Sequence, residues 1–264
     1  MPEFDLVAPL YDATRRPPSP AELGAVAEAL QTCTEVLEAG VGTGRFAKPL
    51  SDRGFHLTGV DISREMLKRA GEKGLPRLLQ ADVHRLPFRD GAFEASLIIH
   101  VLQLIPEPAR ALEELARVAR ERVVAHLPDH RSGGLALRGE LLQRYGEIAA
   151  EMGHPLPPRR RFWENTERVL RDLPPERVFV VEEDISPPTD PEMRWRDLRG
   201  FGGLITVPPE MHERIVARLL EEGRGDELPL GPRTRTLRVA VWETSGLRQL
   251  MKNRSERRNG GLRF

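Results

Sequence analysis

The chain has a single cysteine, no excess of either charge and no long hydrophobic run, and each of these absences excludes a class of protein. Cys33 alone forms neither an internal disulfide nor a zinc site built from several cysteines. Lys and Arg together number 40, as do Asp and Glu, so the summed charge exerts no long-range attraction on nucleic acid or an anionic membrane. The sequence therefore predicts no specific nucleic-acid partner and no membrane partner.

Targeting and metal-binding features are also missing from the sequence. The N-terminal residues Met-Pro-Glu-Phe-Asp lack the charged leader and apolar core of a secretory signal. No run approaches the roughly 18 apolar residues that a membrane-spanning helix needs. The histidines are scattered along the chain, and we expect no metal site. These features predict a cytoplasmic protein, and they give no indication of its oligomeric state.

What the sequence does contain is an alternation of strand-like and helix-like segments. Five strands are predicted first, at residues 35–39, 57–60, 77–83, 93–100 and 122–127. Helices are predicted around them, at residues 21–30, 45–53, 64–73 and 108–120, and later at 209–223. Two further strands are predicted at residues 177–185 and 234–244. Strands that alternate with helices imply a parallel sheet, so we expect an α/β, doubly wound, Rossmann-like fold with a mostly parallel sheet of seven strands.

The alternation stops at residue 131. Helical patterns at residues 135–152 and 163–173 flank a loop rich in proline and arginine, with arginines at 159–161. This insertion is compatible with a lid whose arginines meet an anionic substrate. It is also compatible with a run of charged residues that only faces water. The predicted organisation is an N-terminal segment and helix at 1–34, a main domain at 35–130 and 174–250, a helical insertion at 131–173 and a flexible basic tail at 251–264.

The most informative stretch reads Val-Leu-Glu-Ala-Gly-Val-Gly-Thr-Gly and ends the first strand. Gly40, Gly42 and Gly44 alternate, whereas the dinucleotide fingerprint needs its third glycine three residues after the second. Glycine has no Cβ and tolerates positive φ, so a strand turns sharply there and its backbone approaches a ligand closely. The pattern predicts a cofactor-binding turn, although such turns also serve purely to pack a helix on a strand.

Two acids stand at the ends of the next strands. Asp61 closes the second strand, and Asp82 follows the third, just before a Leu-Pro-Phe segment. Because open α/β sheets bind ligands at the carboxyl ends of their strands, both acids are expected at the same site as the glycines. A carboxylate at the position of Asp61 is suited to accept hydrogen bonds from both hydroxyls of a ribose.

These motifs resemble those of a known family in order and in spacing. Glu-x-Gly-x-Gly-x-Gly, from Glu38 to Gly44, resembles the first motif of the class I S-adenosylmethionine-dependent methyltransferases. Ala-Asp-x-x-x-Leu-Pro-Phe-x-Asp-x-x-Phe-Glu, which contains Asp82, resembles the third-strand motif of their small-molecule members. The resemblance spans about residues 36–127 and is closest to the group with the ubiquinone and menaquinone biosynthesis methyltransferases. It implies the cofactor S-adenosyl-L-methionine and the product S-adenosyl-L-homocysteine.

The resemblance also implies roles for individual residues. Glu38 and the glycine-rich turn would face the methionine moiety. Asp61 and Ile62 would hold the ribose and flank the adenine. Asp82 and Val83 would hold the adenine edge. An N-terminal Tyr-Asp-x-x-Arg segment is similar to the one that covers the cofactor in this group, and its arginine would pair with the methionine carboxylate. The implied cofactor-binding residues are Tyr11, Arg15, Glu38, Gly40, Gly42, Gly44, Asp61, Ile62, Asp82, Val83 and His100.

Each of these residues also has a purely structural interpretation. Glu38 is compatible with an ordinary solvated acid, Asp61 with a cap for the following helix, and Asp82 with a turn former. Tyr11 and Arg15 are compatible with a segment that only docks on the surface.

The sequence does not name the methyl acceptor, nor whether O, N, C or S is methylated. His100 and His126, at the ends of the fourth and fifth strands, are candidates for substrate contact or for a general base, and no catalytic residue is assigned. Residues 102–106 lack the histidine pair of many relatives. No Asn-Pro-Pro-Tyr follows the fourth strand, which favours a small-molecule acceptor. A non-catalytic binding module and a nicotinamide-dependent oxidoreductase remain as alternatives.

Overall fold

The computed structural model describes most of the chain. The described residues are 4–5, 8–9, 11–12, 15, 17–127, 134–156, 163–185, 207–224 and 233–260.

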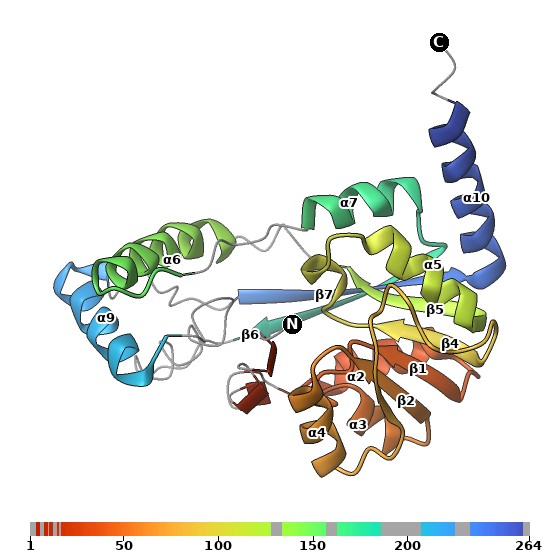
Figure 1. The fold of residues 1–264 in the computed structure, drawn as a ribbon, viewed down its shortest axis with the longest axis horizontal. Helices are drawn as coiled ribbons and strands as arrows, with labels where there is room; N and C mark the ends of the chain where they lie inside the picture. Colours follow the sequence, from red (N-terminus) through yellow and green to blue (C-terminus); the bar gives the residue numbers. More distant parts are fainter. Residues whose placement is uncertain are drawn as a thin grey trace.

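One sheet of seven strands organises the molecule (Figure 1). Its strands are β1 (Glu35–Ala39), β2 (His56–Asp61), β3 (Leu78–Gln80), β4 (Phe93–Ile98), β5 (Ala119–Leu127), β6 (Arg177–Ile185) and β7 (Arg233–Glu243). They lie in the order β3-β2-β1-β4-β5-β7-β6. The five N-terminal strands pair in parallel, whereas β7 runs antiparallel to both β5 and β6. The predicted fold class, a mostly parallel sheet of seven strands, is confirmed.

Helices cover both faces of the sheet because successive side chains of a strand point to opposite faces. On β1, Val36 packs into a core formed with α2 (Pro20–Leu30), α3 (Ala47–Ser51) and α4 (Arg64–Glu72). Its neighbour Leu37 packs into the opposite core. That core is formed with α5 (Pro108–Val118), α7 (Trp163–Asp172), α10 (Thr244–Gly260) and the short 3-10 helix η1 (Leu102–Leu104). Burial on both faces explains why the central strands read as apolar runs.

A pair of helices lies to one side of this layered body, at the left of Figure 1. Helix α6 (Gly134–Glu151) packs on α9 (Pro209–Glu221), although 57 residues separate them in the chain (209 − 152). Tyr145 and His212 are both buried between them, and the Tyr145 hydroxyl lies 2.7 Å from His212 Nδ1. The pair therefore has a small core of its own.

Two predicted segments differ from the structure. The helix expected at residues 45–53 is only the five-residue α3, so Pro49 falls in its first turn, where a proline removes no helical hydrogen bond. The tail expected to be flexible from residue 251 instead continues α10 as far as Gly260, and Arg254 of this helix binds Asp172 of α7. No helix in the described part of the chain is long and apolar enough to span a membrane.

Candidate functional site

The glycine-rich turn follows β1, at the point where the direction of strand order reverses. Strands β2 and β3 lie on one side of β1, and β4 and β5 lie on the other. Such a switch point leaves a crevice outside the carboxyl ends of the strands, because the loops on either side lead away in opposite directions. All five parallel strands therefore bring their C-terminal residues to one edge, which is where the predicted site residues stand.

The three glycines of this turn all have positive φ, of 74° at Gly40, 55° at Gly42 and 78° at Gly44. A Cβ on Gly40 would lie 2.4 Å from the Val101 side chain, and one on Gly44 would lie 2.5 Å from Leu75. These two positions are crowded by packing. A Cβ on Gly42 would meet nothing within 4 Å. Only the central glycine therefore faces open space, while the outer two pack the turn against its neighbours.

Glu38 lies beneath this turn and is only 2% exposed, so the interpretation as a solvated acid is wrong. Its Oε2 atom has no hydrogen-bond partner among the described residues. Burial and the nearby Asp61 carboxylate raise the pKa of Glu38 to about 8, against the opposing effects of Arg45 and the Ala47 amide. The turn therefore stands beside a buried carboxyl group that a cation would stabilise in its charged form.

Asp61 connects the turn to the next helix. Its two carboxylate oxygens accept hydrogen bonds from the Gly42 amide at 2.8 Å and from the Ser63 amide at 2.9 Å. The cap of α4 is Ser63, whose hydroxyl accepts the Met66 amide, so Asp61 is not itself the cap. Burial raises the pKa of Asp61, and the amides of Ser63, Gly42 and Ile62 oppose this shift. Ile62, which follows it, is partly exposed beside the carboxylate.

Asp82 and Val83 follow the short strand β3. Asp82 accepts hydrogen bonds from the amide and from Nδ1 of His84, so it does form a turn, as its structural interpretation predicted. Partial burial works to raise the pKa of Asp82, but the His84 contacts outweigh this effect and leave the pKa below its ordinary value. Its side chain is about half exposed, whereas Val83 is buried. Asp82 therefore remains accessible to a ligand, and Val83 anchors the loop.

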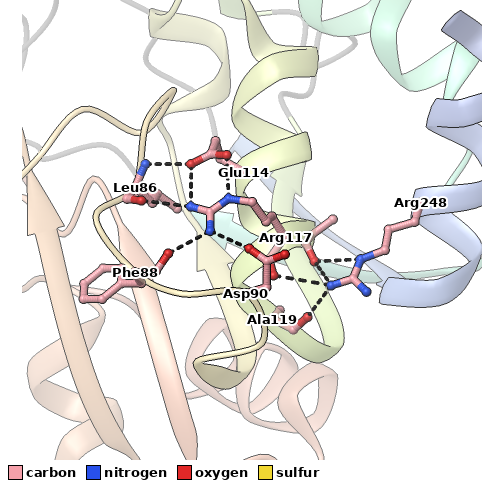
Figure 2. A network of polar contacts seen from close by, with 8 residues as sticks. Leu86, Phe88, Asp90, Glu114, Arg117, Ala119 and Arg248 are labelled. Atoms are coloured by element: carbon pink, nitrogen blue, oxygen red, sulfur yellow. Dashed lines mark hydrogen bonds and ion pairs between the residues drawn. The ribbon is translucent and has the colours of Figure 1, made fainter.

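Sequence reasoning missed the group that holds the next part of this loop, residues 86–90 (Figure 2). Arg117 of α5 donates hydrogen bonds to the carbonyl oxygens of Leu86 and Phe88 and to Asp90. Glu114 binds the same guanidinium and also accepts the Leu86 amide. The contacts of Glu114 and Asp90 raise the pKa of Arg117 further above its already high value. The i, i+3 spacing of a glutamate and an arginine on α5 was the available signal.

His100 and His126 are brought together by the neighbouring strands β4 and β5. Their ring centroids lie 4.0 Å apart, and the Phe46 ring lies 6.1 Å from that of His100. His126 is 6% exposed. His100 has a φ of 58°, which costs a residue with a side chain about 1–2 kcal/mol. Backbone strain of this kind clusters at functional sites, where the surrounding structure maintains it, although Gln31 adopts a positive φ simply as the C-cap of α2.

The N-terminal segment contacts the glycine-rich turn and the C-terminal end of α4 through Asp12. Asp12 accepts a hydrogen bond from Thr43 at 2.6 Å and pairs with Lys73 at 2.7 Å. The Arg15 guanidinium lies over the Tyr11 ring, 5.6 Å from its centroid. Tyr11 and Arg15 therefore belong to a segment that docks beside the turn. Asp12, Thr43 and Lys73 were not predicted, because no local pattern links residues so far apart.

The arginines at 159–161, for which the sequence left a lid and a run of solvated charges as alternatives, lie outside the described residues. Among the residues that are described, no group of three His, Cys, Asp or Glu side chains is placed to hold a metal ion.

Comparison with known proteins gives this arrangement a family. The methyltransferase domain family matches residues 37–125. The demethylmenaquinone methyltransferase of Paenarthrobacter aurescens (strain TC1) is 32% identical, across 82% of this chain and 89% of that protein. The phosphatidylethanolamine N-methyltransferase of Cereibacter sphaeroides is 42% identical, but over only 33% of this chain and 45% of that protein.

Two solved structures show the same fold at low sequence identity. One, described as the conversion of a disulfide bond into a thioacetal group during echinomycin biosynthesis, has a TM-score of 0.55 and 19% identity, and covers 92% of each chain. A putative methyltransferase from Bacillus halodurans C-125 has a TM-score of 0.51 and 16% identity, with 85% of this chain and 97% of that chain covered. The chain therefore belongs to the class I methyltransferases, enzymes that use S-adenosylmethionine as cofactor and release S-adenosylhomocysteine, and it resembles their quinone-biosynthesis members.

Proposed function

We propose that the chain transfers the methyl group of S-adenosylmethionine to a small-molecule acceptor by direct displacement. The observation that carries this proposal is the open side of Gly42, in a turn that follows the buried acid Glu38, with the strained His100 just after the neighbouring strand β4. The similarity to a demethylmenaquinone methyltransferase supports a small-molecule acceptor. The segment after β4 reads Val-Leu-Gln-Leu-Ile-Pro, without the Asn-Pro-Pro-Tyr typical of many enzymes that methylate amino groups of nucleic acid bases or glutamine.

The residues at the carboxyl edge of the sheet fit this cofactor. S-adenosylmethionine carries an ammonium and a sulfonium group, and the unpaired Oε2 atom of Glu38 offers a buried partner for positive charge. Asp61, with Ile62 beside it, is placed for the ribose hydroxyls, and the exposed carboxylate of Asp82, with Val83 behind it, for the adenine edge. Tyr11 and Arg15 lie on the segment that docks over the turn. Gly40 and Gly44 contribute by packing, and Gly42 by leaving space.

The residues of the chain have a limited task in this reaction. When bound, the cofactor supplies a methyl group already activated on its sulfonium. The protein then has to hold the acceptor atom in line with that methyl group and exclude water, and such positioning supplies roughly 7–11 kcal/mol of a barrier. His100 and His126, whose rings lie 4.0 Å apart, are the candidates for the acceptor side, because an imidazole is able to orient an acceptor or take its proton near neutral pH.

Titration calorimetry and label transfer test the proposal. We expect S-adenosylmethionine and S-adenosylhomocysteine to bind while NAD does not. A methyl-labelled cofactor incubated with a small-molecule metabolite extract should give a labelled product, whose mass identifies the acceptor. Binding of NAD in preference to S-adenosylmethionine would overturn the assignment. Binding of S-adenosylmethionine with label appearing only in RNA or protein would overturn the small-molecule part.

Gly42→Ala tests whether the open side of the turn is the cofactor side. The new methyl group meets no protein atom, so the stability loss should be only the about 1–2 kcal/mol cost of the left-handed backbone. The affinity for S-adenosylmethionine, measured by calorimetry, should nevertheless fall at least tenfold. Gly54→Ala is the matched control, since Gly54 also has positive φ and open space but follows α3. An equal loss of affinity in both variants would contradict the prediction.

His126→Leu tests the acceptor side. Leucine fills a similar volume, so the dissociation constant of S-adenosylmethionine should stay within about threefold of wild type. Transfer to the acceptor identified above should fall about 100-fold, which is typical when a proton-transfer group is lost. His56→Leu is the control, because His56 begins β2 at the opposite edge of the sheet and pairs with Glu35. Unchanged transfer in His126→Leu would remove this residue from the reaction.

A further inference from the structure

Strand β6 forms one edge of the sheet. It is nine residues long and pairs with β7 along its whole length, and in the described part of the chain no strand pairs with its other side. In an antiparallel pair the backbone groups of alternate residues point away from the partner, so β6 presents a row of them at this edge. Edges of this kind are usually kept short or covered, because they offer a template for another strand. The edge of β6 is therefore suited to receive a further strand.

Two valines stand exposed on one face of this edge strand. Val178 and Val180 are 37% and 55% exposed, and Val180 is the most exposed large hydrophobic side chain in the described part of the chain. Phe179 and Val181, which alternate with them, point to the opposite face and pack against the core beside α2. Exposed apolar side chains on a long edge strand are typical of an association surface. The edge thus combines outward backbone groups with apolar surface.

The charges of β6 make the strand complementary to itself. A two-fold axis through Val180 would pair two copies of β6 antiparallel and keep like faces of the strands together. Arg177 then lies opposite Glu183 of the second copy, and the symmetry makes this pair twice. Moving the axis by one residue would instead place Arg177 opposite Val181 or Ile185. One register alone therefore pairs the arginine with an acid, and it sets Val180 against its own copy.

Both charged groups are available for this pairing. The Arg177 side chain is exposed, and its guanidinium lies over the Phe179 ring, 4.8 Å from the centroid, which holds it on the required face. Glu183 is partly exposed, and its Oε1 atom accepts the Ser19 hydroxyl. Among the described residues nothing binds its second oxygen. A second copy of the chain is thus the partner whose charges fit this edge.

We propose that two copies of this chain associate edge to edge through β6, with the two-fold axis at Val180, and join their sheets into one continuous sheet. Each chain has one β6, so the assembly closes at two copies. The proposal does not depend on the reaction or on the cofactor. It assigns a role to the exposed edge that is furthest from β3 in the strand order.

Sedimentation equilibrium of the full chain over a series of concentrations tests the dimer. The wild type should approach twice the chain mass of 29.8 kDa. Val180→Lys sets two like charges directly opposite each other, so the dissociation constant should rise at least tenfold while the melting temperature stays near that of wild type. Leu79→Lys is the matched control, because Leu79 is 43% exposed on β3, the strand at the other edge. A wild type that stays monomeric, or a dimer lost in Leu79→Lys and kept in Val180→Lys, would overturn the proposal.

A charge swap tests the register. Arg177→Glu and Glu183→Arg should each weaken the dimer about tenfold, because each places like charges opposite each other at two symmetric positions. The double variant should restore the wild-type dissociation constant. Ser19 loses its contact with Glu183 in these variants, but its hydroxyl still accepts the Glu22 amide at the start of α2. Failure of the double variant to recover would contradict the pairing of Arg177 with Glu183.

Cysteine cross-linking locates the axis. Opposed residues of an antiparallel pair have Cα atoms about 4.5–5.5 Å apart, which a disulfide spans. Val180→Cys should therefore form a disulfide-linked dimer under mild oxidation. Val178→Cys should not, because the two copies of residue 178 would lie roughly 13 Å apart along the strands. Cys33, the native cysteine, is 1% exposed and gives no background. Cross-linking of Val178→Cys alone, or of neither variant, would overturn the axis at Val180.

Discussion

Replacing Asp61 by asparagine should weaken the binding of S-adenosylmethionine about 100-fold and destabilise the protein as well. In the proposed site the carboxylate accepts both ribose hydroxyls, and each charged hydrogen bond is worth about 1.5–3 kcal/mol. Losing the charge at both positions corresponds to roughly two powers of ten in affinity. Titration calorimetry with S-adenosylhomocysteine measures this loss directly, without any need for the acceptor.

The stability effect has a separate cause, which lies in the free protein. The two oxygens of Asp61 serve the amides of Gly42 and Ser63, and an asparagine side chain has only one acceptor oxygen to replace them. One buried amide is then left without a partner, at a cost of about 1–3 kcal/mol. Urea denaturation measures this loss, and it should appear with or without cofactor.

Asp52→Asn provides the comparison, because Asp52 is a surface carboxylate paired with Lys48. Asp52→Asn should change neither the affinity for S-adenosylmethionine nor the stability of the protein. A stability loss in Asp61→Asn with wild-type affinity would show that the carboxylate serves only the turn. Wild-type affinity together with wild-type stability in Asp61→Asn would contradict both roles given to this carboxylate.

Glu38→Gln should abolish a pH dependence of folding that the wild type shows between about pH 5 and pH 8. Burial raises the pKa of Glu38 from 4.5 to about 8 in the folded chain, so the folded state holds a proton that the unfolded state has already released. The contribution of Glu38 to stability is therefore highest below pH 4.5. It falls as the pH rises and levels off above pH 8. The total change is on the order of 5 kcal/mol.

The measurement is the free energy of unfolding by urea at a series of pH values. Wild type should lose stability across this window, whereas Glu38→Gln should not, and the variant should be the more stable of the two at pH 9. Glu35→Gln is a matched control on the same strand, because Glu35 is exposed and paired with Arg77. A slope that survives in Glu38→Gln, or one that disappears in Glu35→Gln, would place the titrating group elsewhere.

The same substitution should act in the opposite direction on cofactor binding. A neutral glutamine no longer offers charge to the ammonium and sulfonium groups, so we expect at least a tenfold loss of affinity for S-adenosylmethionine at pH 8. A variant that folds more stably yet binds more weakly would show that the acid is retained for the ligand at the expense of the fold.

The sequence predicted the fold well because its signals are local and repeated. Apolar runs bounded by glycine or by an acid marked β1, β2 and β4, and the structure places them where they were expected. The errors arose where local patterns are ambiguous. Residues 251–260 are polar and basic in composition, which favoured a flexible tail. They nevertheless continue helix α10, which packs on the body through Leu247 and Arg254. A tertiary contact of that kind is not visible in local composition.

Apart from Tyr11 and Arg15, the predicted site residues lie at one edge of the sheet, since each stands near or after the C-terminal end of a parallel strand. Their environment was less predictable. Nothing in the sequence distinguishes Gly42 from Gly40, because that difference depends on Val101, which is distant in the chain. The Asp12 and Arg117 contacts were missed for the same reason. Motif spacing places a residue at a strand end, but only the packed chain decides what surrounds it.

The helix pair α6–α9 has a consequence for how this enzyme can change over time. The described members of its core come from these two helices and from Val207, so a substitution there leaves the packing of the sheet untouched. The glycine-rich turn, in contrast, is packed into the main body through Val101 and Leu75. Mutations in the helix pair are therefore free to accumulate without loss of cofactor binding. A library confined to α6 and α9 should yield folded proteins that still hold S-adenosylmethionine.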